Sequence, residues 1–139
     1  DLLLKMGYGG SLSDAGMVTK YSHDDGIDGI IKEDKLGLDK IYIQAKRYNT
    51  TNTIVKPQIQ QFVGALDEQK ASKGVFITTS SYSSEARKYA EEKASKKIVL
   101  IDGQELARYM IEYNVGVSLK RVYEVKRIDS DYFEDDNND

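Results

Sequence analysis

The chain has 139 residues, of which 40% are hydrophobic, and this is enough to build one compact domain with its own core. It has no cysteine, which excludes disulfide frameworks and thiolate metal sites. It also has no apolar run near the roughly 18 residues that span a bilayer and no signal-peptide pattern, which favours a soluble, cytoplasmic protein. The formal net charge is −3, but six acids and no base lie between Asp129 and Asp139, so residues 1–128 hold 20 bases against 17 acids and a nucleic-acid partner stays open.

The first half of the chain predicts a short helix followed by strands. The apolar run from Leu2 to Met6 has no capping residue before it and closes at Gly7, which indicates that the chain begins inside a helix. After a turn region rich in glycine and serine, strands are expected at about 17–22, 26–33 and 38–48. The polar turn that ends in Gly37 suits a hairpin, so these strands should pair antiparallel.

The next part predicts helices that alternate with buried strands. Pro57 can occupy the first turn of a helix over about 57–72. The short apolar runs 74–78 and 98–101 are typical of strands covered on both faces. Between them, a helix is expected to place three small residues against the sheet: Ala86, Ala90 and Ala94.

The last part predicts one more helix and one or two strands. Asp102 and Glu105 form an N-cap and N3 pair that starts a helix, and Asn114 can end it. The mixed apolar and basic pattern over 115–128 predicts the final strands, and the acidic segment 129–139 predicts a tail without fixed structure.

Together these elements predict an α/β fold with a mixed central β-sheet flanked by helices. Two strand–helix–strand units in the second half imply parallel pairing with right-handed crossovers, joined to the antiparallel hairpin of the first half. We expect a single domain over residues 1–128, with its first helix cut short, followed by the acidic tail 129–139.

The strand expected over 38–48 separates apolar from polar side chains. Because side chains alternate between the two faces of a strand, the apolar side chains point one way: Ile41, Ile43 and Ala45. Gln44 and Lys46 point the other way. In the preceding strand, three residues are expected to share the apolar face: Ile27, Gly29 and Ile31.

Asp28 lies on the opposite face of that preceding strand, and antiparallel pairing would bring it beside Gln44 and Lys46. Mg²⁺ prefers oxygen ligands, so the Asp28 carboxylate, the Gln44 amide oxygen, the Ala45 carbonyl and a scissile phosphate could complete a site. Lys46 could then orient the attacking water or stabilise charge on the phosphorane. Gly26 leaves room for a nucleic-acid backbone, and the pattern predicts phosphodiester hydrolysis, with a surface hydrogen-bond cluster as the alternative.

Six segments resemble the catalytic domain of Mrr-type restriction endonucleases. They are GIDGII at 26–31, IQAKRY at 43–48, IQQFVGAL at 59–66, GVFITTS at 74–80, IVLIDG at 98–103 and IEYNVGV at 111–117. They follow one another in the family's order across most of the chain, which makes the resemblance more specific than any single segment.

The resemblance implies the PD-(D/E)xK nuclease fold, with Asp28 as the motif aspartate, Gln44 where relatives usually have an acid, and Lys46 as the motif lysine. It also implies a divalent metal, double-stranded DNA as substrate and the role of a type IV restriction enzyme directed at modified DNA. A homodimer is expected because cutting both strands usually needs two sites. The family often carries a separate DNA-recognition domain upstream of the nuclease.

The sequence departs from the family pattern in two ways. Gln44 is neutral, so the predicted site has one negative charge fewer than that of an acid-containing relative. Many similar domains also carry an acid on the first helix, at a position that would lie upstream of Asp1.

Further polar groups are candidates for DNA or metal-water contacts. Gln60, near the start of the second expected helix, can face the site. Ser80 belongs to a hydroxyl run between a strand and a helix and can hold a phosphate, with plain capping as the alternative. His23 and Asp25 lie near the expected metal, although a solvated turn suits both. Four bases are candidate phosphate contacts or a solvated face: Lys120, Arg121, Lys126 and Arg127.

Three other functions stay open at this point. A nuclease-like module that binds DNA without cutting it would follow if the neutral Gln44 leaves the metal site empty. A junction-resolving nuclease of the same fold would prefer branched DNA. A nucleotide-binding domain is disfavoured, because the glycines at 7–10 lack G-x-G-x-x-G spacing and do not open a helix.

Overall fold

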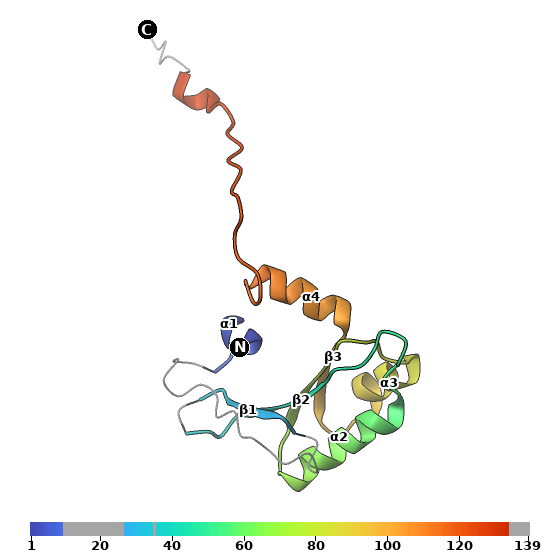
Figure 1. Ribbon diagram of the computed structural model, residues 1–139. Helices are drawn as coiled ribbons and strands as arrows, with labels where there is room; N and C mark the ends of the chain where they lie inside the picture. Colours follow the sequence, from blue (N-terminus) through green and yellow to red (C-terminus); the bar gives the residue numbers. More distant parts are fainter. Residues whose placement is uncertain (10–26, 35, 134–139) are drawn as a thin grey trace.

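The computed structural model describes residues 1–9, 27–34 and 36–133 (Figure 1). Its elements in chain order are α1 Leu2–Lys5, β1 Gly29–Lys32, β2 Lys40–Lys46, α2 Lys56–Glu68, β3 Lys73–Thr78, α3 Ser84–Lys88, the π-helical turn η1 Tyr89–Lys93, β4 Lys97–Ile101, α4 Gly103–Glu112 and the 3-10 turn η2 Ser130–Phe133. The strand expected over 17–22 and the tail residues 134–139 lie outside the described ranges.

The four described strands form one mixed sheet in the order β1-β2-β3-β4. β1 pairs antiparallel with β2, whereas β2 pairs parallel with β3, and β3 pairs parallel with β4. The register places Gly29 opposite Ile43, and Ile43 opposite Val75. The predicted α/β fold, with a hairpin joined to a parallel half, is therefore confirmed.

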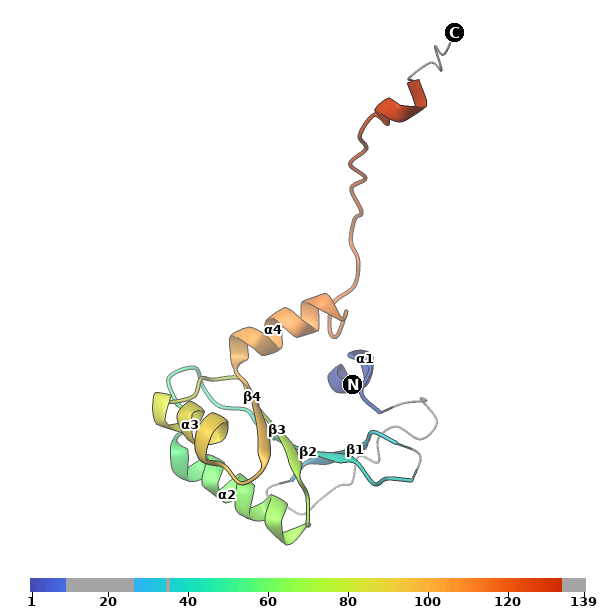
Figure 2. The ribbon, with the colours of Figure 1, turned by 180° about the vertical axis from the view of Figure 1, so that it is seen from behind.

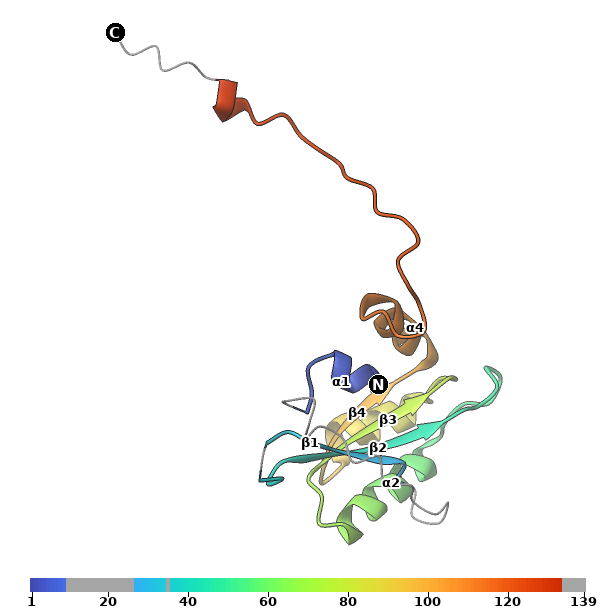
Figure 3. The same ribbon diagram turned by 60° about the vertical axis from the view of Figure 1, so that its left-hand side comes forward.

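Helices cover the two faces of this sheet unequally. α2 and α3 lie together on one face, and α1 and α4 lie on the other (Figures 2 and 3). The larger core lies under α2, where Phe62 and Phe76 are almost fully buried and their rings meet edge to face, with centroids 5.4 Å apart. The smaller core lies under α1 and α4 and includes Leu3 and Ile101.

α2 begins as the sequence predicts but ends before the expected position 72. Pro57 lies in its first turn, and its apolar side is buried. The helix stops at Glu68 because Lys70 has a left-handed backbone with φ 55°, which turns the chain toward β3. Gly74 then allows close packing, since a Cβ there would lie 2.8 Å from Phe62 and Leu66 side-chain atoms.

The alanine helix packs against the sheet as predicted, with Ala86 and Ala90 buried. It forms as α3 followed by η1, and Ala94 is already extended at its end. The prediction that 98–101 is covered on both faces is wrong, because Val99 is 47% exposed. In the described sheet β4 is the last strand, and a groove of about 290 Å³ between α1 and α4 leaves this face partly open.

Residues 115–128 are described and form no strand, so the prediction of final strands there is wrong. Beyond α4 the chain leaves the body as an extended arm, after turning at Asn114 and Gly116, which have φ values of 55° and 70° (Figure 1). Val125 on this arm is 96% exposed. Bases interrupt the apolar pattern of the arm, and a strand also needs a neighbour that shares its hydrogen bonds, which pattern alone does not supply.

Among the helices of the described ranges, none has both the length and the apolar character needed to cross a membrane.

Candidate active site

Asp28 lies against β2 at the point that the sequence predicts. It directly precedes β1, and its Oδ2 accepts a hydrogen bond of 2.7 Å from the Ala45 backbone N–H. Its own N–H donates to the Ile43 carbonyl, also at 2.7 Å. The carboxylate is therefore held beside the strand segment that carries Gln44 and Lys46.

The two faces of β2 separate as predicted. Ile41 and Ile43 belong to the core under α1 and α4, whereas Tyr42 belongs to the core under α2. By the alternation of strand side chains, Gln44 and Lys46 share the face of Tyr42, and both are half-buried.

The prediction that Ile27 shares a face with Ile31 is wrong. Ile27 packs in the core under α2, and Ile31 packs in the core on the opposite face of the sheet. Regular alternation starts only at Gly29, where β1 begins, so the two residues before it do not follow the pattern of the strand. Asp28 still reaches β2, because its side chain bonds the Ala45 backbone directly.

The oxygen atoms at this position suit a hard divalent cation. Within the described ranges, Asp28 Oδ1 and the Gln44 amide have no protein hydrogen-bond partner. The Ala45 carbonyl points to the same side of β2 as the Ala45 N–H, which faces Asp28, because both groups of a strand residue face the same neighbour. Carboxylate, amide and carbonyl oxygens are ligands of Mg²⁺, whose remaining positions are usually filled by water and substrate phosphate.

This donor set contains a single carboxylate among the described residues. No group of three or more His, Cys, Asp or Glu side chains comes together in those ranges. A metal held here would thus depend on neutral oxygens and on the DNA phosphate for the rest of its ligands. His23, Asp25 and Gly26, the other candidates near this position, lie outside the described residues.

Hydroxyl-bearing residues at the end of β3 and just after it fix the end of β2. The Lys46 carbonyl accepts hydrogen bonds from the Thr78 hydroxyl at 2.9 Å and from the Thr79 N–H at 3.4 Å. Ser80, a candidate phosphate contact, is buried, and its hydroxyl donates to the Asn52 carbonyl. These hydroxyls are engaged inside the protein, so they anchor the strand that carries Lys46.

Two glutamines of α2 differ in their surroundings. Gln60, the candidate from the sequence, is exposed on the helix. Gln58, which sequence reasoning missed, accepts from the Val55 N–H at 2.9 Å and donates to the Tyr48 hydroxyl at 3.1 Å. Its position three residues after the N-cap, beside Pro57, is the signal that could have identified it as a capping residue.

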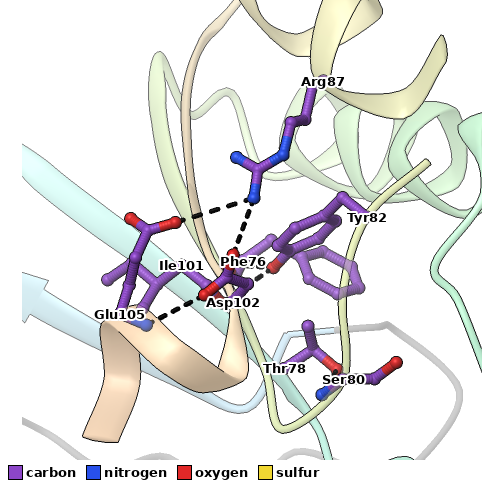
Figure 4. Close-up of polar contacts among 8 residues, drawn as sticks. All are labelled: Phe76, Thr78, Ser80, Tyr82, Arg87, Ile101, Asp102 and Glu105. Atoms are coloured by element: carbon purple, nitrogen blue, oxygen red, sulfur yellow. Dashed lines mark hydrogen bonds and ion pairs between the residues drawn. The ribbon is translucent and has the colours of Figure 1, made fainter. Parts of the chain in front are cut away.

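A buried tyrosine joins β3 and the end of β4 (Figure 4). The Tyr82 hydroxyl lies 2.7 Å from the Phe76 carbonyl and 3.1 Å from the Ile101 carbonyl. Burial raises the pKa of this hydroxyl, which keeps it protonated as a donor. Tyr82 thus ties the two parallel strands together at their carboxyl ends.

Arg87 extends this connection to α4. Its guanidinium bonds Asp102 Oδ2 at 2.8 Å and lies 3.6 Å from Glu105, and it covers the Tyr82 ring at 5.4 Å (Figure 4). Asp102 Oδ1 accepts from the Glu105 N–H at 2.9 Å, which confirms the predicted N-cap. The start of α4 is therefore fixed to α3 and to both strands.

We expect Tyr82→Phe to destabilise the domain by about 1–3 kcal/mol, because buried carbonyls lose their hydrogen-bond partner while the ring remains. Urea denaturation of the variant and the wild type measures this difference. A loss below the error of the urea measurement would show that the ring alone accounts for the role of Tyr82.

The same variant should change the dependence of stability on pH. The folded-state pKa of Tyr82 is raised, whereas an unfolded tyrosine ionises near its ordinary pKa of about 10. The contribution of Tyr82 is therefore fully present below about pH 10 and is lost as the pH rises above that value. The difference in unfolding free energy between wild type and Tyr82→Phe should shrink over this alkaline range.

Comparison with known proteins places this chain in a family. A family model described as a restriction endonuclease, that of the Mrr catalytic domain, matches residues 1–110. The type IV methyl-directed restriction enzyme EcoKMrr of Escherichia coli (strain K12) is 49% identical over 134 residues, which are 96% of this chain and 42% of that protein. This chain therefore spans less than half of that relative.

Two solved structures share the fold. The DNA modification-dependent restriction endonuclease AspBHI aligns with a TM-score of 0.59 and 18% identity, covering 74% of this chain and 27% of that one. The MspJI restriction endonuclease, in complex with a 27-mer oligonucleotide, aligns with a TM-score of 0.56 and 29% identity. The alignment covers 73% of this chain and 24% of that one. The match of the family model over residues 1–110 shows that the chain belongs to the restriction endonuclease family with the Mrr-type catalytic domain.

Proposed function

We propose that this chain is the catalytic domain of a Mg²⁺-dependent DNA endonuclease, and that it serves a type IV restriction enzyme directed at modified DNA. The observation that carries the proposal is the hydrogen bond from the Ala45 N–H to Asp28. It holds the carboxylate beside the segment of β2 that carries Gln44 and Lys46, and this supports a site for hydrolysis of a phosphodiester. The methyl-directed relative EcoKMrr and the oligonucleotide complex of MspJI support DNA as the substrate.

Asp28, Gln44 and Ala45 would hold the metal through one carboxylate, one amide and one carbonyl oxygen. When bound, Mg²⁺ supplies Lewis-acid chemistry, since it lowers the pKa of a water molecule and offsets the phosphate charge. The role of Asp28 is to provide the negative charge of this set. Gln44 contributes an oxygen without further charge, so we expect the metal to bind more weakly than it would beside two carboxylates.

Lys46 would act on the reacting phosphate. In the reaction, the oxygen of a water bonds to phosphorus, one ester P–O bond breaks and the departing oxygen takes up a proton. The Lys46 ammonium can orient the water or offset the negative charge that develops on the phosphate oxygens. Because Lys46 is half-buried, its charge is less screened than that of an exposed lysine.

The partner of this domain would be double-stranded DNA, held by contacts with the phosphate backbone. A homodimer would place one site on each strand of the duplex. The chain spans 42% of EcoKMrr, which leaves room in a longer protein for a separate DNA-recognition domain.

Plasmid cleavage tests this function directly. The wild-type chain should nick or linearise supercoiled plasmid in Mg²⁺ and should be inactive in EDTA. Methylated and unmethylated plasmid, compared side by side, test the preference for modified DNA.

Asp28→Asn should lose this activity, because the amide keeps an acceptor for the Ala45 N–H but removes the charge. Asp67→Asn serves as the matched control and should cut normally. Asp67 is an exposed carboxylate near the C-terminal end of α2, where it pairs with Lys96. Metal-independent cutting would refute the metal role. If the chain shifts DNA in a gel but never cuts it, the alternative function holds. The chain would then be a nuclease-like module that binds DNA without cutting it, because the neutral Gln44 leaves the metal site empty.

A further inference from the structure

Three groups of Tyr48 are held by two residues that lie elsewhere in the chain, Thr79 and Gln58. Its N–H donates to Thr79 Oγ1 at 2.9 Å, and the Thr79 hydroxyl donates back to the Tyr48 carbonyl at 2.6 Å. Its own hydroxyl accepts from Gln58 Nε2 at 3.1 Å. Tyr48 lies just beyond the end of β2, and these bonds fix its backbone and its ring together.

The orientation of Gln58 is itself fixed. Its Oε1 accepts from the Val55 N–H at 2.9 Å, in the capping arrangement that opens α2. The amide group therefore presents its Nε2 hydrogens to Tyr48. The ring of Tyr48 packs against the core under α2, so neither end of the side chain is left to move independently.

The Lys46 ammonium lies over this ring. Lys46 Nζ is 5.9 Å from the centroid of the Tyr48 ring, within the range of about 6 Å over which a ring face attracts a cation. Among the described residues Lys46 makes no ion pair and no side-chain hydrogen bond. A lysine has a flexible stem, so the Tyr48 ring is what restricts the position of its ammonium.

We propose that Tyr48 is a positioning residue, and that its ring, clamped by Thr79 and Gln58, is the platform that holds Lys46 in place for cleavage. The inference rests on the proposed function of Lys46. It adds a residue outside the metal-binding set and explains why the hydroxyl after β3 is tied to the chain beyond β2.

Single-turnover cleavage of plasmid by the whole chain tests the platform. Tyr48→Leu should lower the cleavage rate by about 10²-fold while the affinity for DNA stays close to that of the wild type, because a displaced catalytic group lowers the rate more than it lowers binding. Tyr48→Phe keeps the ring and should retain most of the rate. This rescue separates the platform from the hydrogen bond with Gln58.

A second lysine–tyrosine contact provides the matched control. Lys56 Nζ, in the first turn of α2, lies 5.8 Å from the ring of Tyr89 in η1. Tyr89→Leu removes a ring from beneath a lysine in the same way and should leave cleavage unchanged. If Tyr48→Leu does not fold, Thr79→Val takes its place, since it removes both backbone clamps on Tyr48 and should lower the rate in the same direction.

A measurement without DNA or metal distinguishes this inference from the proposed function. The Lys46 ε-methylene protons should be shifted upfield by the ring in NMR spectra of the wild type and Tyr48→Phe, and the shift should vanish in Tyr48→Leu. An upfield shift in a chain that never cuts DNA would overturn the function but keep the platform contact. An unshifted signal in the wild type, or wild-type cleavage by Tyr48→Leu, would overturn the platform.

Discussion

Replacing Lys46 with alanine is expected to lower the single-turnover rate of DNA cleavage by about 10²- to 10⁴-fold, the range found when a group that assists proton transfer or offsets transition-state charge is removed. The affinity for DNA should change little by comparison, because one lysine among 20 basic residues contributes little to contacts with the phosphate backbone. The fold should survive, since the Lys46 side chain is half-buried and its contact is with the Tyr48 ring.

Lys40→Ala is the matched control for this prediction. Lys40 is the first residue of β2 and Lys46 the last, and an even spacing of six puts both on one face of the strand. At a rise of about 3.3 Å per residue, the two side chains lie about 20 Å apart. Lys40→Ala should therefore cut DNA normally, and equal losses from both substitutions would mean that Lys46 acts through general charge and not at the site.

Phe76→Ala is expected to destabilise the domain by about 3–5 kcal/mol, which is a large part of the roughly 5–15 kcal/mol that holds a typical domain together. Phe76 lies in β3, and its side chain is 0% exposed. Its ring meets Phe62 at 5.4 Å and Tyr82 at 6.0 Å, both edge to face. The substitution opens a cavity at the point where α2, β3 and the chain after β3 meet.

Urea denaturation followed by circular dichroism measures this loss. Phe76→Leu should cost less, because it preserves most of the volume. Val99→Ala on the neighbouring strand is a control for strand propensity, since Val99 is 47% exposed and fills no comparable space. If Phe76→Ala and Val99→Ala have similar unfolding free energies, the ring cluster does not carry the stability assigned to it here.

Local patterns in the sequence were enough to predict the main elements of the sheet. The alternation along β2 predicted that the faces of the strand separate, and the structure has Ile41 and Ile43 in one core and Tyr42 in the other. Hairpin chemistry predicted the antiparallel pairing that brings Asp28 to Ala45. These features depend on neighbours along the chain or on one short turn, so periodicity captures them.

Other features depend on contacts between distant parts of the chain. The bonds between Tyr48 and Thr79 join residues 31 positions apart, and no spacing rule links them. For the same reason the sequence could not show that Ser80 would be buried or that Gln58, and not Gln60, would reach Tyr48. The prediction of strands over 115–128 is wrong for a related reason. The pattern of these residues fits a strand, but a strand forms only beside a partner strand, and the pattern does not show whether there is one.

The two kinds of strand pairing that meet at β2 suggest an order of assembly. The bond between Asp28 and Ala45 closes a loop of 17 residues through a hairpin, whereas the clamp of Tyr48 by Thr79 spans 31 residues and needs the whole crossover through α2. Local hairpins close sooner during folding than parallel pairings with long connections. A nascent chain would thus form the contact between Asp28 and Ala45 before the clamp of Tyr48 by Thr79. The proposed site would therefore be complete only after the whole sheet has formed.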